Sequence, residues 1–150
     1  MSSENKMDSR KVQQAVERCK SKGLRCTKLM GLTIELLVRT GKPLTVSEII
    51  SSAEIADRYD QASVYRLMTR LEEKGIVRRL GLRERAASFV LRHLHEHDDY
   101  IVCTSCGVVE RVEIDCPVAP LEGIIASASG FRNLEHELEF FGVCPRCPAA

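Results

Sequence analysis

The sequence predicts an α+β protein in two parts: a helical N-terminal part that ends in a β-hairpin, and a smaller mixed part that holds metal. Amphipathic helical patterns recur as far as about residue 75. Two strand-like segments joined by a basic turn then follow over residues 76–91. Beyond residue 92, histidines and paired cysteines gather at a density that core packing does not require. We therefore expect two domains, residues 1–92 and residues 93–150.

Length and composition are those of a globular protein with enough chain to bury a core. Of the 150 residues, 44% are hydrophobic and 29% are charged. No run approaches the roughly 18 apolar residues that a membrane span requires, and the N-terminus lacks the apolar core of a signal peptide. We expect a cytoplasmic protein with no membrane partner, in which the seven cysteines are thiols or metal ligands rather than disulfides.

The net charge of +1 conceals an asymmetry between the two parts. Residues 1–92 hold 19 Lys and Arg against 11 Asp and Glu, whereas residues 93–150 hold 3 against 10. A basic part joined to an acidic part rich in metal ligands suits an anion-binding module fused to a cation-binding one. Two ordinarily solvated surfaces are the alternative interpretation.

Four helices are expected in the basic part. Each begins near a polar residue that can cap a helix N-terminus, and all but the third end at a glycine. The third opens with TVSE at residues 45–48, which is the spacing of a capping box. Residues before Asp8 are expected to be frayed. The expected helices cover residues 8–23, 27–41, 45–50 and 60–75.

The fourth helix is the expected DNA-reading element. Its apolar residues recur from Val64 at positions i, i+3, i+4 and i+7, so the polar residues between them face outward. Strands over residues 76–80 and 86–91 would complete a winged helix-turn-helix. Its fourth helix would enter the major groove and its wing would contact phosphates. The candidate DNA contacts are Arg25, Lys28, Ser63, Tyr65, Arg66, Thr69, Arg70, Arg83 and Arg85.

The acidic part predicts a small β-β-α-β domain closed by zinc. Strands are expected over residues 100–103, 108–114 and 134–143, with a helix over residues 120–129. Each of two Cys-x-x-Cys pairs can place two thiolates on one turn, and two such turns complete a tetrahedron around a structural Zn²⁺. A redox dithiol or buried cysteines are the alternatives. The proposed zinc ligands are Cys103, Cys106, Cys144 and Cys147.

The histidines require a separate, exchangeable site, because four cysteines already complete the first one. Mixed nitrogen and oxygen ligands suit Zn²⁺, Fe²⁺, Mn²⁺ or Ni²⁺, and affinity order alone does not choose among them. A solvated surface is the alternative for any single histidine. Cys116 is not included, since a helix-starting Pro117 accounts for it. The candidate ligands of the regulatory metal are His93, His95, His97, Asp98, Asp99, Glu110, Glu113 and His136.

These segments together resemble the ferric uptake regulator (Fur) superfamily of metal-responsive bacterial repressors over residues 10–147. The resemblance lies in GLRCT at residues 23–27, in Ala62-Ser-Val-Tyr-Arg66, in HxHxH before Cys103-x-x-Cys106-Gly, and in EHELEFFGVC. It implies a homodimer with a structural zinc and no catalytic residues. A second metal is implied to close two DNA-binding lobes onto a palindromic double-stranded operator.

The resemblance also bears on which metal is sensed. FVLRH at residues 89–93 is similar to the zinc-uptake regulator (Zur) branch, which favours Zn²⁺ as the second metal. That branch often has a further cysteine where Arg92 stands. Ligands of the iron- and peroxide-type sites are replaced at Pro43, Val90 and Tyr100. An iron-, manganese- or peroxide-responsive member of the family is one alternative, and a member that no longer responds to metal is another.

Two interpretations come from other classes of protein. A zinc hydrolase would need an open metal position and a general base, for which HEHDD could serve. A nucleobase deaminase is excluded, because the chain lacks the His-x-Glu and Pro-Cys-x-x-Cys motifs. A zinc-stabilised module that binds protein instead of DNA is the second interpretation, and the basic N-terminal part argues against it.

Overall fold

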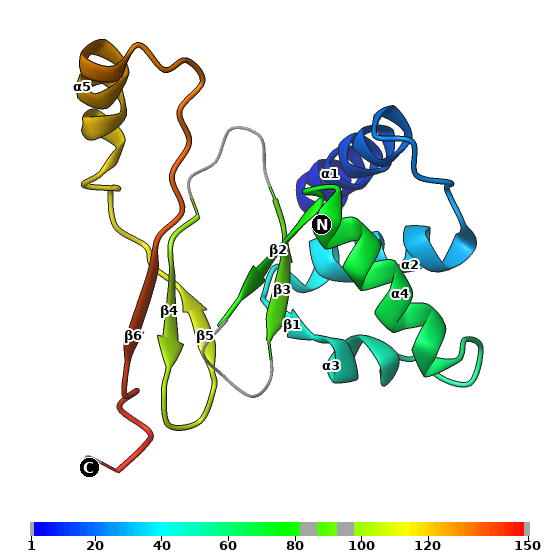
Figure 1. Ribbon diagram of the computed structural model, residues 1–150. Coiled ribbons are helices and arrows are strands. Elements are labelled where there is room, and N and C mark those ends of the chain that lie inside the picture. The colour runs from blue at the N-terminus through cyan, green and yellow to red at the C-terminus, as the bar shows by residue number, and fades with distance from the viewer. Residues whose placement is uncertain (1, 82–86, 93–97, 149–150) are drawn as a thin grey trace. The chain divides into compact units, whose positions relative to one another are not determined.

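The chain divides into two units, the N-terminal unit Met1–Arg92 and the C-terminal unit His93–Ala150. The computed structural model describes residues 2–81, 87–92 and 98–148 and is traced in Figure 1. Within these residues, no helix combines the length and the apolar character needed to cross a membrane.

Side-chain caps set where the helices of the N-terminal unit begin. The side chains of Thr27 and Asp60 accept hydrogen bonds from backbone N–H groups in the first turns of their helices. Thr45 and Glu48 form the expected capping box. Gly41 ends the second helix with a φ of 57°, which glycine adopts without the steric cost of a Cβ. The helices are α1 (Ser2–Ser21), α2 (Lys28–Thr40), α3 (Val46–Ile50) and α4 (Gln61–Glu73).

The first helix begins earlier than the sequence predicted. We expected a start at Asp8, but α1 is helical from Ser2. No proline or glycine lies in this stretch, so nothing in it stops the helix from continuing past a residue that could have capped it. At the other end of α1, the Arg18 guanidinium donates hydrogen bonds to the carbonyls of Gly75, at 3.0 Å, and Arg92. These bonds tie α1 to the ends of the elements that follow.

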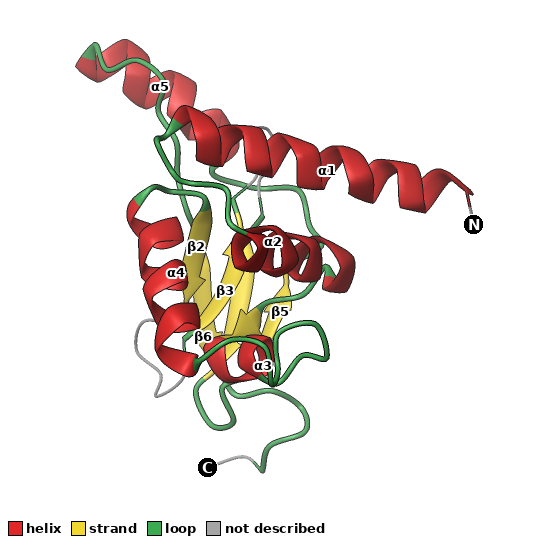
Figure 2. Ribbon diagram, turned by 90° about the vertical axis from the view of Figure 1, so that its right-hand side faces the viewer, coloured by secondary structure: helices red, strands yellow, loops and turns green. Residues whose placement is uncertain are grey.

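A three-stranded antiparallel sheet completes the N-terminal unit. Its strands β1 (Leu44–Thr45), β2 (Val77–Leu80) and β3 (Ser88–Leu91) lie in the order β1-β3-β2. Helices α2 and α4 pack against this sheet, and Figure 2 shows them beside it. The wing predicted from the sequence is the β2–β3 hairpin; its turn, with Arg83 and Arg85, lies outside the described residues.

The core of the N-terminal unit is built from the apolar faces of these elements. The helical spacing that starts at Val64 turns one side of α4 inward, as predicted, and leaves its polar side in solvent. The side chains that are almost completely buried include Met30, Ile34, Ile49, Ile55, Val64, Met68, Leu71 and Ile76. Together with the hairpin, this arrangement confirms the predicted winged helix-turn-helix.

The C-terminal unit has the predicted β-β-α-β order. Strand β4 pairs antiparallel with β5 and parallel with β6, which gives the sheet order β5-β4-β6. A parallel pair needs a crossover connection, which here contains α5. The expected strand over residues 134–143 is shorter than predicted, and His136 lies before it rather than on it. The elements are β4 (Tyr100–Cys103), β5 (Val109–Arg111), α5 (Ala119–Ser129) and β6 (Glu139–Gly142).

Candidate metal centres and nucleic-acid interface

The sheet of the C-terminal unit brings the two Cys-x-x-Cys turns together. Cys103 is the last residue of β4, and Cys106 lies in the turn that follows it. Because β4 and β6 run parallel with Cys103 opposite Gly142, the turn after β6 leaves the same end of the sheet. Cys144 and Cys147 lie in that second turn. Strand pairing therefore places four sulfurs from two distant parts of the chain side by side.

The spacing of these sulfurs fits a tetrahedral metal site. The Sγ atom of Cys147 lies 3.9 Å from that of Cys103 and 3.7 Å from that of Cys144, and the Cys106–Cys144 distance is 3.8 Å. A zinc–sulfur bond of about 2.3 Å gives a tetrahedron with edges of about 3.8 Å. A disulfide would bring two sulfurs to about 2.05 Å, and these cysteines are free. The residues present thus fit a structural zinc.

Hydrogen bonds shift the pKa values of the thiols in the cysteine cluster. The backbone N–H groups of Cys144 and Cys106 point at Cys103 Sγ, at 3.3 Å and 3.5 Å, and they lower the pKa of Cys103 to about 6. A hydrogen bond with Ser105 lowers the pKa of Cys147, but the adjoining thiols of Cys106 and Cys144 raise it to about 11 overall. Four thiolates this close require a cation between them.

A second cluster of metal-ligand side chains lies in the same unit. One ligand atom from each of Asp99, Cys116 and His136 lies within 4.8 Å of the others. Cys116 Sγ approaches His136 Nε2 to 3.0 Å. Asp99 is buried, and the other two are partly buried. One carboxylate, one thiol and one imidazole make a set of three protein ligands, the number typical of metal sites that keep an open position.

Glu122 contacts the second ring nitrogen of His136. Its Oε1 lies 2.7 Å from His136 Nδ1, while Nε2 faces Cys116. An imidazole that binds a metal through one ring nitrogen commonly donates the other N–H to a carboxylate, which fixes the tautomer and the ring orientation. This contact sets His136 with Nε2 toward the centre of the second cluster.

The other predicted regulatory ligands have different surroundings. Asp98 pairs with Arg111 at 2.6 Å, and Glu110 pairs with Arg146 at 3.2 Å. Glu113 is exposed and belongs to neither of the two clusters found among the described residues. The remaining three, His93, His95 and His97, lie outside the described residues.

Cys116 is the residue that sequence reasoning missed. We attributed its position to Pro117 at the start of a helix, and the helix does begin just beyond it, at Ala119. The available clue was that Cys116 is a cysteine outside both Cys-x-x-Cys pairs, in the part of the chain that holds every histidine. Its partner His136 is 20 residues away, so local spacing did not reveal the contact.

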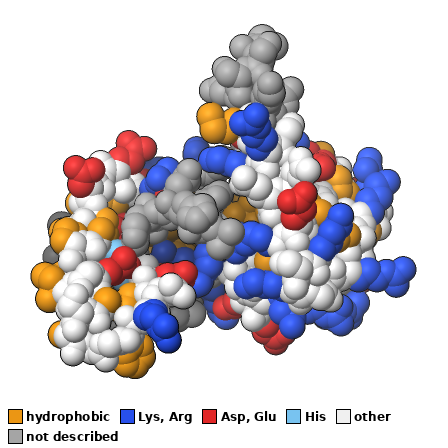
Figure 3. Space-filling view, turned by 90° about the horizontal axis from the view of Figure 1, so that it is seen from above, with side chains coloured by type: hydrophobic (Ala, Val, Ile, Leu, Met, Phe, Trp, Pro, Cys, Tyr) orange, Lys and Arg blue, Asp and Glu red, His pale blue; other side chains and the backbone are white. Residues whose placement is uncertain are grey.

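The outward face of α4 carries the predicted DNA contacts. Tyr65 exposes 52% of its surface, and Arg66, Thr69 and Arg70 are also exposed. Ser63 accepts a hydrogen bond from the Arg66 guanidinium at 2.9 Å. Figure 3 shows Lys and Arg side chains spread over the surface of the N-terminal unit, on the right of that view. The helix therefore offers solvent an aromatic ring and guanidinium groups, which can contact bases and phosphates.

A pocket of about 440 Å³ lies between α4 and the start of α2. Arg25, Lys28, Arg66 and Arg70 line it, and no acidic residue does. The N-terminal N–H groups of a helix also favour negative charge. This pocket has the charge expected of a site for a DNA phosphate.

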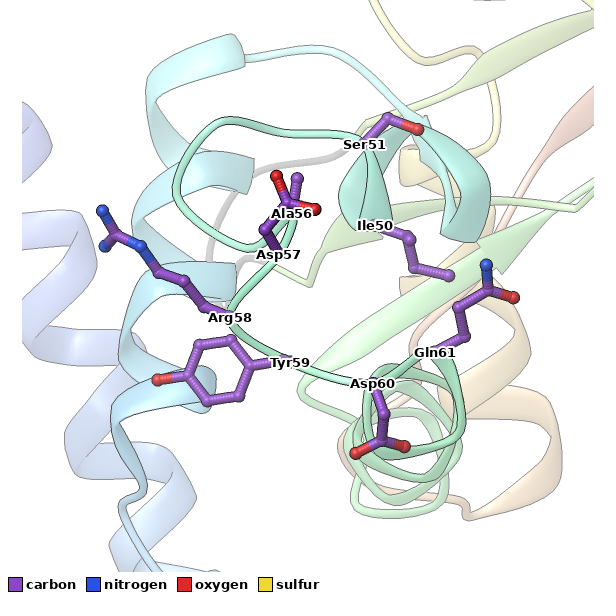
Figure 4. Close-up of a pocket in the computed structure, with 8 residues that line it drawn as sticks. All are labelled: Ile50, Ser51, Ala56, Asp57, Arg58, Tyr59, Asp60 and Gln61. Atoms are coloured by element: carbon purple, nitrogen blue, oxygen red, sulfur yellow. The ribbon is translucent and has the colours of Figure 1, made fainter.

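A second pocket, of about 570 Å³, lies between α3 and α4 and differs in charge. Figure 4 shows its lining, with Asp57 and Asp60 beside Arg58 and Tyr59. Two carboxylates repel phosphate, so this pocket is the poorer candidate for the nucleic-acid backbone. Asp60 instead caps α4, with its carboxylate 2.8 Å from the Ser63 N–H.

The C-terminal unit leaves many apolar side chains in solvent. No residue of α5 is buried, and Leu121, Ile124 and Ile125 expose 46%, 64% and 50% of their surfaces. Figure 3 shows hydrophobic side chains on this unit, on the left of that view. Exposed apolar residues gathered in this way mark interaction surfaces. The others are Ile101, Ile114, Phe131, Phe140, Phe141 and Val143.

Comparison with known proteins identifies the family. Residues 21–141 match the Ferric uptake regulator family. The ferric uptake regulation protein of Legionella pneumophila is 29% identical over 133 residues, which are 87% of this chain and 96% of that protein. These matches agree with the resemblance of the sequence motifs.

Solved structures share the fold. The ferric uptake regulator of Helicobacter pylori, whose structure has three functional metal binding sites, superposes with a TM-score of 0.70 at 23% identity. The match covers 93% of this chain and 95% of that one. The structure of holo XcZur superposes with a TM-score of 0.56 at 26% identity, over 93% and 97% of the two chains. The chain therefore belongs to the ferric uptake regulator family of dimeric, metal-responsive transcriptional regulators, which bind DNA and are not enzymes.

Proposed function

We propose that this chain is a zinc-responsive repressor of metal-homeostasis genes and that Asp99, Cys116 and His136 bind the zinc it senses. The observation that carries the choice of metal is the approach of Cys116 Sγ to His136 Nε2 at 3.0 Å. Thiolate ligands favour softer or borderline cations such as Zn²⁺, whereas carboxylate and water ligands suit Mn²⁺. A sulfur donor in the second cluster thus supports zinc over manganese.

Iron or manganese is the second candidate for the sensed metal. Family relatives named for ferric uptake support this alternative. His93, His95, His97, Asp98, Glu110 and Glu113 stay in the proposal as further ligands, and their nitrogen and oxygen atoms suit Fe²⁺ as well. The metal that raises DNA affinity decides between the candidates.

The cysteine cluster holds a separate, structural zinc in this proposal. Cys103, Cys106, Cys144 and Cys147 would saturate a tetrahedral ion and leave no position for exchange. Its sulfurs come from turns at the ends of β4 and β6, so the ion would fasten the two turns together. Binding energy of this kind is folding energy, because the unfolded chain has no assembled site.

The N-terminal unit is the proposed DNA-binding domain, with α4 as the recognition helix. Tyr65 and Arg66, with Ser63 and Thr69 beside them, are placed to contact base edges and the adjoining backbone. Arg25, Lys28 and Arg70 line the basic pocket and would bind phosphates, and Arg83 and Arg85 are proposed phosphate contacts of the wing. Counterion release then makes DNA affinity fall steeply with salt.

The C-terminal unit is the proposed dimerisation domain. The exposed apolar side chains on α5, β4 and β6 give two copies a surface to bury against each other. A two-fold dimer presents two recognition helices, so we expect a palindromic double-stranded operator. A regulator of this kind acts where the chromosome is, and we place it in the cytoplasm.

The proposed mechanism is a metal-biased equilibrium between dimer arrangements. Zinc at the second cluster would favour the arrangement in which both α4 helices reach successive major grooves. The bound metal can shift this equilibrium only by the difference between its affinities for the two arrangements.

Matched metal and DNA titrations test the proposal. The purified dimer is analysed for tightly held zinc, then titrated with Zn²⁺, Fe²⁺ and Mn²⁺ while its binding to a palindromic operator is followed. We expect one zinc per chain that survives mild chelation, and a second Zn²⁺ that raises DNA affinity. Cys116→Ser should weaken the second effect, whereas Cys26→Ser, an exposed cysteine outside both clusters, should not.

Other outcomes would overturn particular parts of the proposal. Metal-independent DNA binding would remove the sensing role of the second cluster. A response to Fe²⁺ or Mn²⁺ but not to Zn²⁺ would replace the proposed metal. If the protein shows no salt-dependent binding to DNA, a zinc-stabilised module that binds protein becomes the better interpretation.

A further inference from the structure

We propose that Glu122 is a positioning residue that links the second metal cluster to the dimer surface, so that metal binding and dimerisation strengthen each other. The inference rests on the proposed function, because it takes the second cluster as a metal site and a second copy of this chain as the partner. It adds a physical connection between the second cluster and the dimer surface, the Glu122–His136 contact at 2.7 Å.

Helix α5 is weakly held within its own unit. None of its residues is buried, and its apolar residues belong to no described core cluster. Apolar packing within one chain therefore does little to fix its position. The Glu122–His136 contact is a polar link between α5 and the segment that leads into β6.

The second cluster is connected to the beginning of α5 at two residues. Cys116 lies three residues before Ala119, where α5 starts, and Glu122 is in the first turn. A metal bound by Cys116 and His136 would fix the residues just before α5 directly. It would fix the first turn through the hydrogen bond from His136 Nδ1 to Glu122. The side chains at both points are partly buried, so water competes less for this contact than for one at the open surface.

The same helix carries part of the proposed dimer surface. Leu121 immediately precedes Glu122, and Ile124 and Ile125 lie two and three positions further on; all three are about half exposed or more. A second copy of this chain is the occupant that the family's dimeric state indicates. A helix already held in place loses less conformational freedom when a partner covers it, so its apolar face binds more tightly. Coupling of this kind is reciprocal, and the dimer should also hold the metal more tightly.

Dissociation of the full-length dimer tests the link. Sedimentation at a series of protein concentrations gives the dimer Kd of chains that retain the structural zinc, with and without saturating Co²⁺. For the wild type we expect Co²⁺ to lower the Kd on the order of tenfold, within the usual range of coupling between sites. Co²⁺ bound through Cys116 also gives a sulfur-to-metal absorption band, which reports occupancy independently of dimerisation.

Three variants separate positioning from general damage. Glu122→Ala should bind Co²⁺ on the order of tenfold more weakly, and at saturation it should show little change in dimer Kd. Glu122→Gln keeps an oxygen acceptor for His136 Nδ1 and should restore most of the change. Ser127→Ala, which removes a hydroxyl that donates a hydrogen bond to the Gly123 carbonyl within α5, should behave as the wild type.

The outcomes distinguish this inference from the proposed metal site. An equal Co²⁺ effect on the dimers of wild type and Glu122→Ala, with both fully occupied, would overturn the link and leave the site standing. Wild-type chains that bind no Co²⁺ beyond the cysteine cluster would overturn both. If Co²⁺ binds the wild type but its dimer Kd does not change, the link is overturned and the metal site is not.

Discussion

The Sγ atom of Cys116 lies 3.0 Å from Nε2 of His136, although 20 residues separate them in the chain. The loop after β5 and the segment before β6 carry these two side chains, and Asp99, just before β4, completes the group. All three residues precede or follow strands of one sheet. The sheet therefore positions a sulfur, a nitrogen and an oxygen donor around one point, and this mixture of donors determines which metals can bind.

Replacing Cys116 should change both the affinity and the ranking of metals at the second cluster. In Cys116→Ser a hydroxyl takes the place of the thiolate, so we expect Zn²⁺ to bind on the order of tenfold or more weakly and Mn²⁺ to change less. Competition with a coloured chelator gives both affinities, and Co²⁺ spectra should lose the sulfur charge-transfer band of this site. Cys26→Ser is the matched control. An unchanged Zn²⁺ affinity in Cys116→Ser would mean that the thiol is not a ligand.

Removing a sulfur from the cysteine cluster should strongly destabilise the C-terminal unit. In Cys147→Ser three thiolates remain, and we expect the loss of the tightly held zinc. Structural zinc sites have apparent binding free energies of about 10–16 kcal/mol, so the loss of the ion should lower the stability of this unit sharply. Zinc analysis with hydrogen exchange of each unit measures this. Amides of β4 and β6 should lose protection while those of α2 and α4 keep it. Retention of one zinc per chain would contradict the four-cysteine assignment.

The sequence predicted the structural site better than the regulatory one, for a physical reason. A Cys-x-x-Cys turn is local, so its geometry follows from three-residue spacing, and the fold had only to pair two such turns. The contact between Cys116 and His136 is tertiary, and no periodicity announces it. Strand β1 is another example: its two residues, Leu44 and Thr45, are too few to show alternation, and pairing with β3 makes them a strand.

Stability of the metal-free C-terminal unit should depend on pH in two opposite directions. The pKa of Cys103 falls from an ordinary value near 9 to about 6, so this thiol stabilises the fold above about pH 9, and the effect is lost as pH falls through about 6. The pKa of Cys147 is raised to about 11, so its contribution is full below about pH 9 and is lost as pH rises through about 11. Stability should therefore rise between about pH 6 and 9 and decline above that range.

Urea unfolding of chelator-stripped protein at a series of pH values measures this profile. Cys103→Ser should flatten most of the rise, while Cys26→Ser should leave it intact. A flat profile for the wild type would show that the N–H groups of Cys144 and Cys106 do not stabilise the Cys103 thiolate in solution.

The capping box at the start of α3 should contribute measurably to the N-terminal unit. Thr45 Oγ1 accepts the Glu48 N–H at 3.2 Å, and the Glu48 carboxylate accepts the Thr45 N–H at 2.7 Å. Thr45→Ala removes the first of these bonds, together with the 2.8 Å bond that the Thr45 hydroxyl donates to the Glu48 carboxylate, and should cost about 1 kcal/mol of unfolding free energy. Ser47→Ala, an exposed position in the same helix, is the control and should stay within about 0.5 kcal/mol of the wild type. Equal losses of unfolding free energy in the two variants would show that the capping box makes no specific contribution to stability.

Arg70 should bind DNA phosphate rather than read sequence. It lines the basic pocket beside Arg25 and Lys28 at the start of α2, where the charge suits an anion. We therefore expect Arg70→Ala to weaken binding to operator DNA and to unrelated DNA by similar factors. It should also reduce the slope of log K against log salt by about 1. Arg39→Ala is the matched control, since Arg39 is exposed on α2 but pairs with Glu54 at 2.5 Å. Fluorescence anisotropy across a salt series, on both DNAs, measures the slopes. A loss confined to the operator, with the slope unchanged, would instead make Arg70 a base contact and place the phosphate elsewhere.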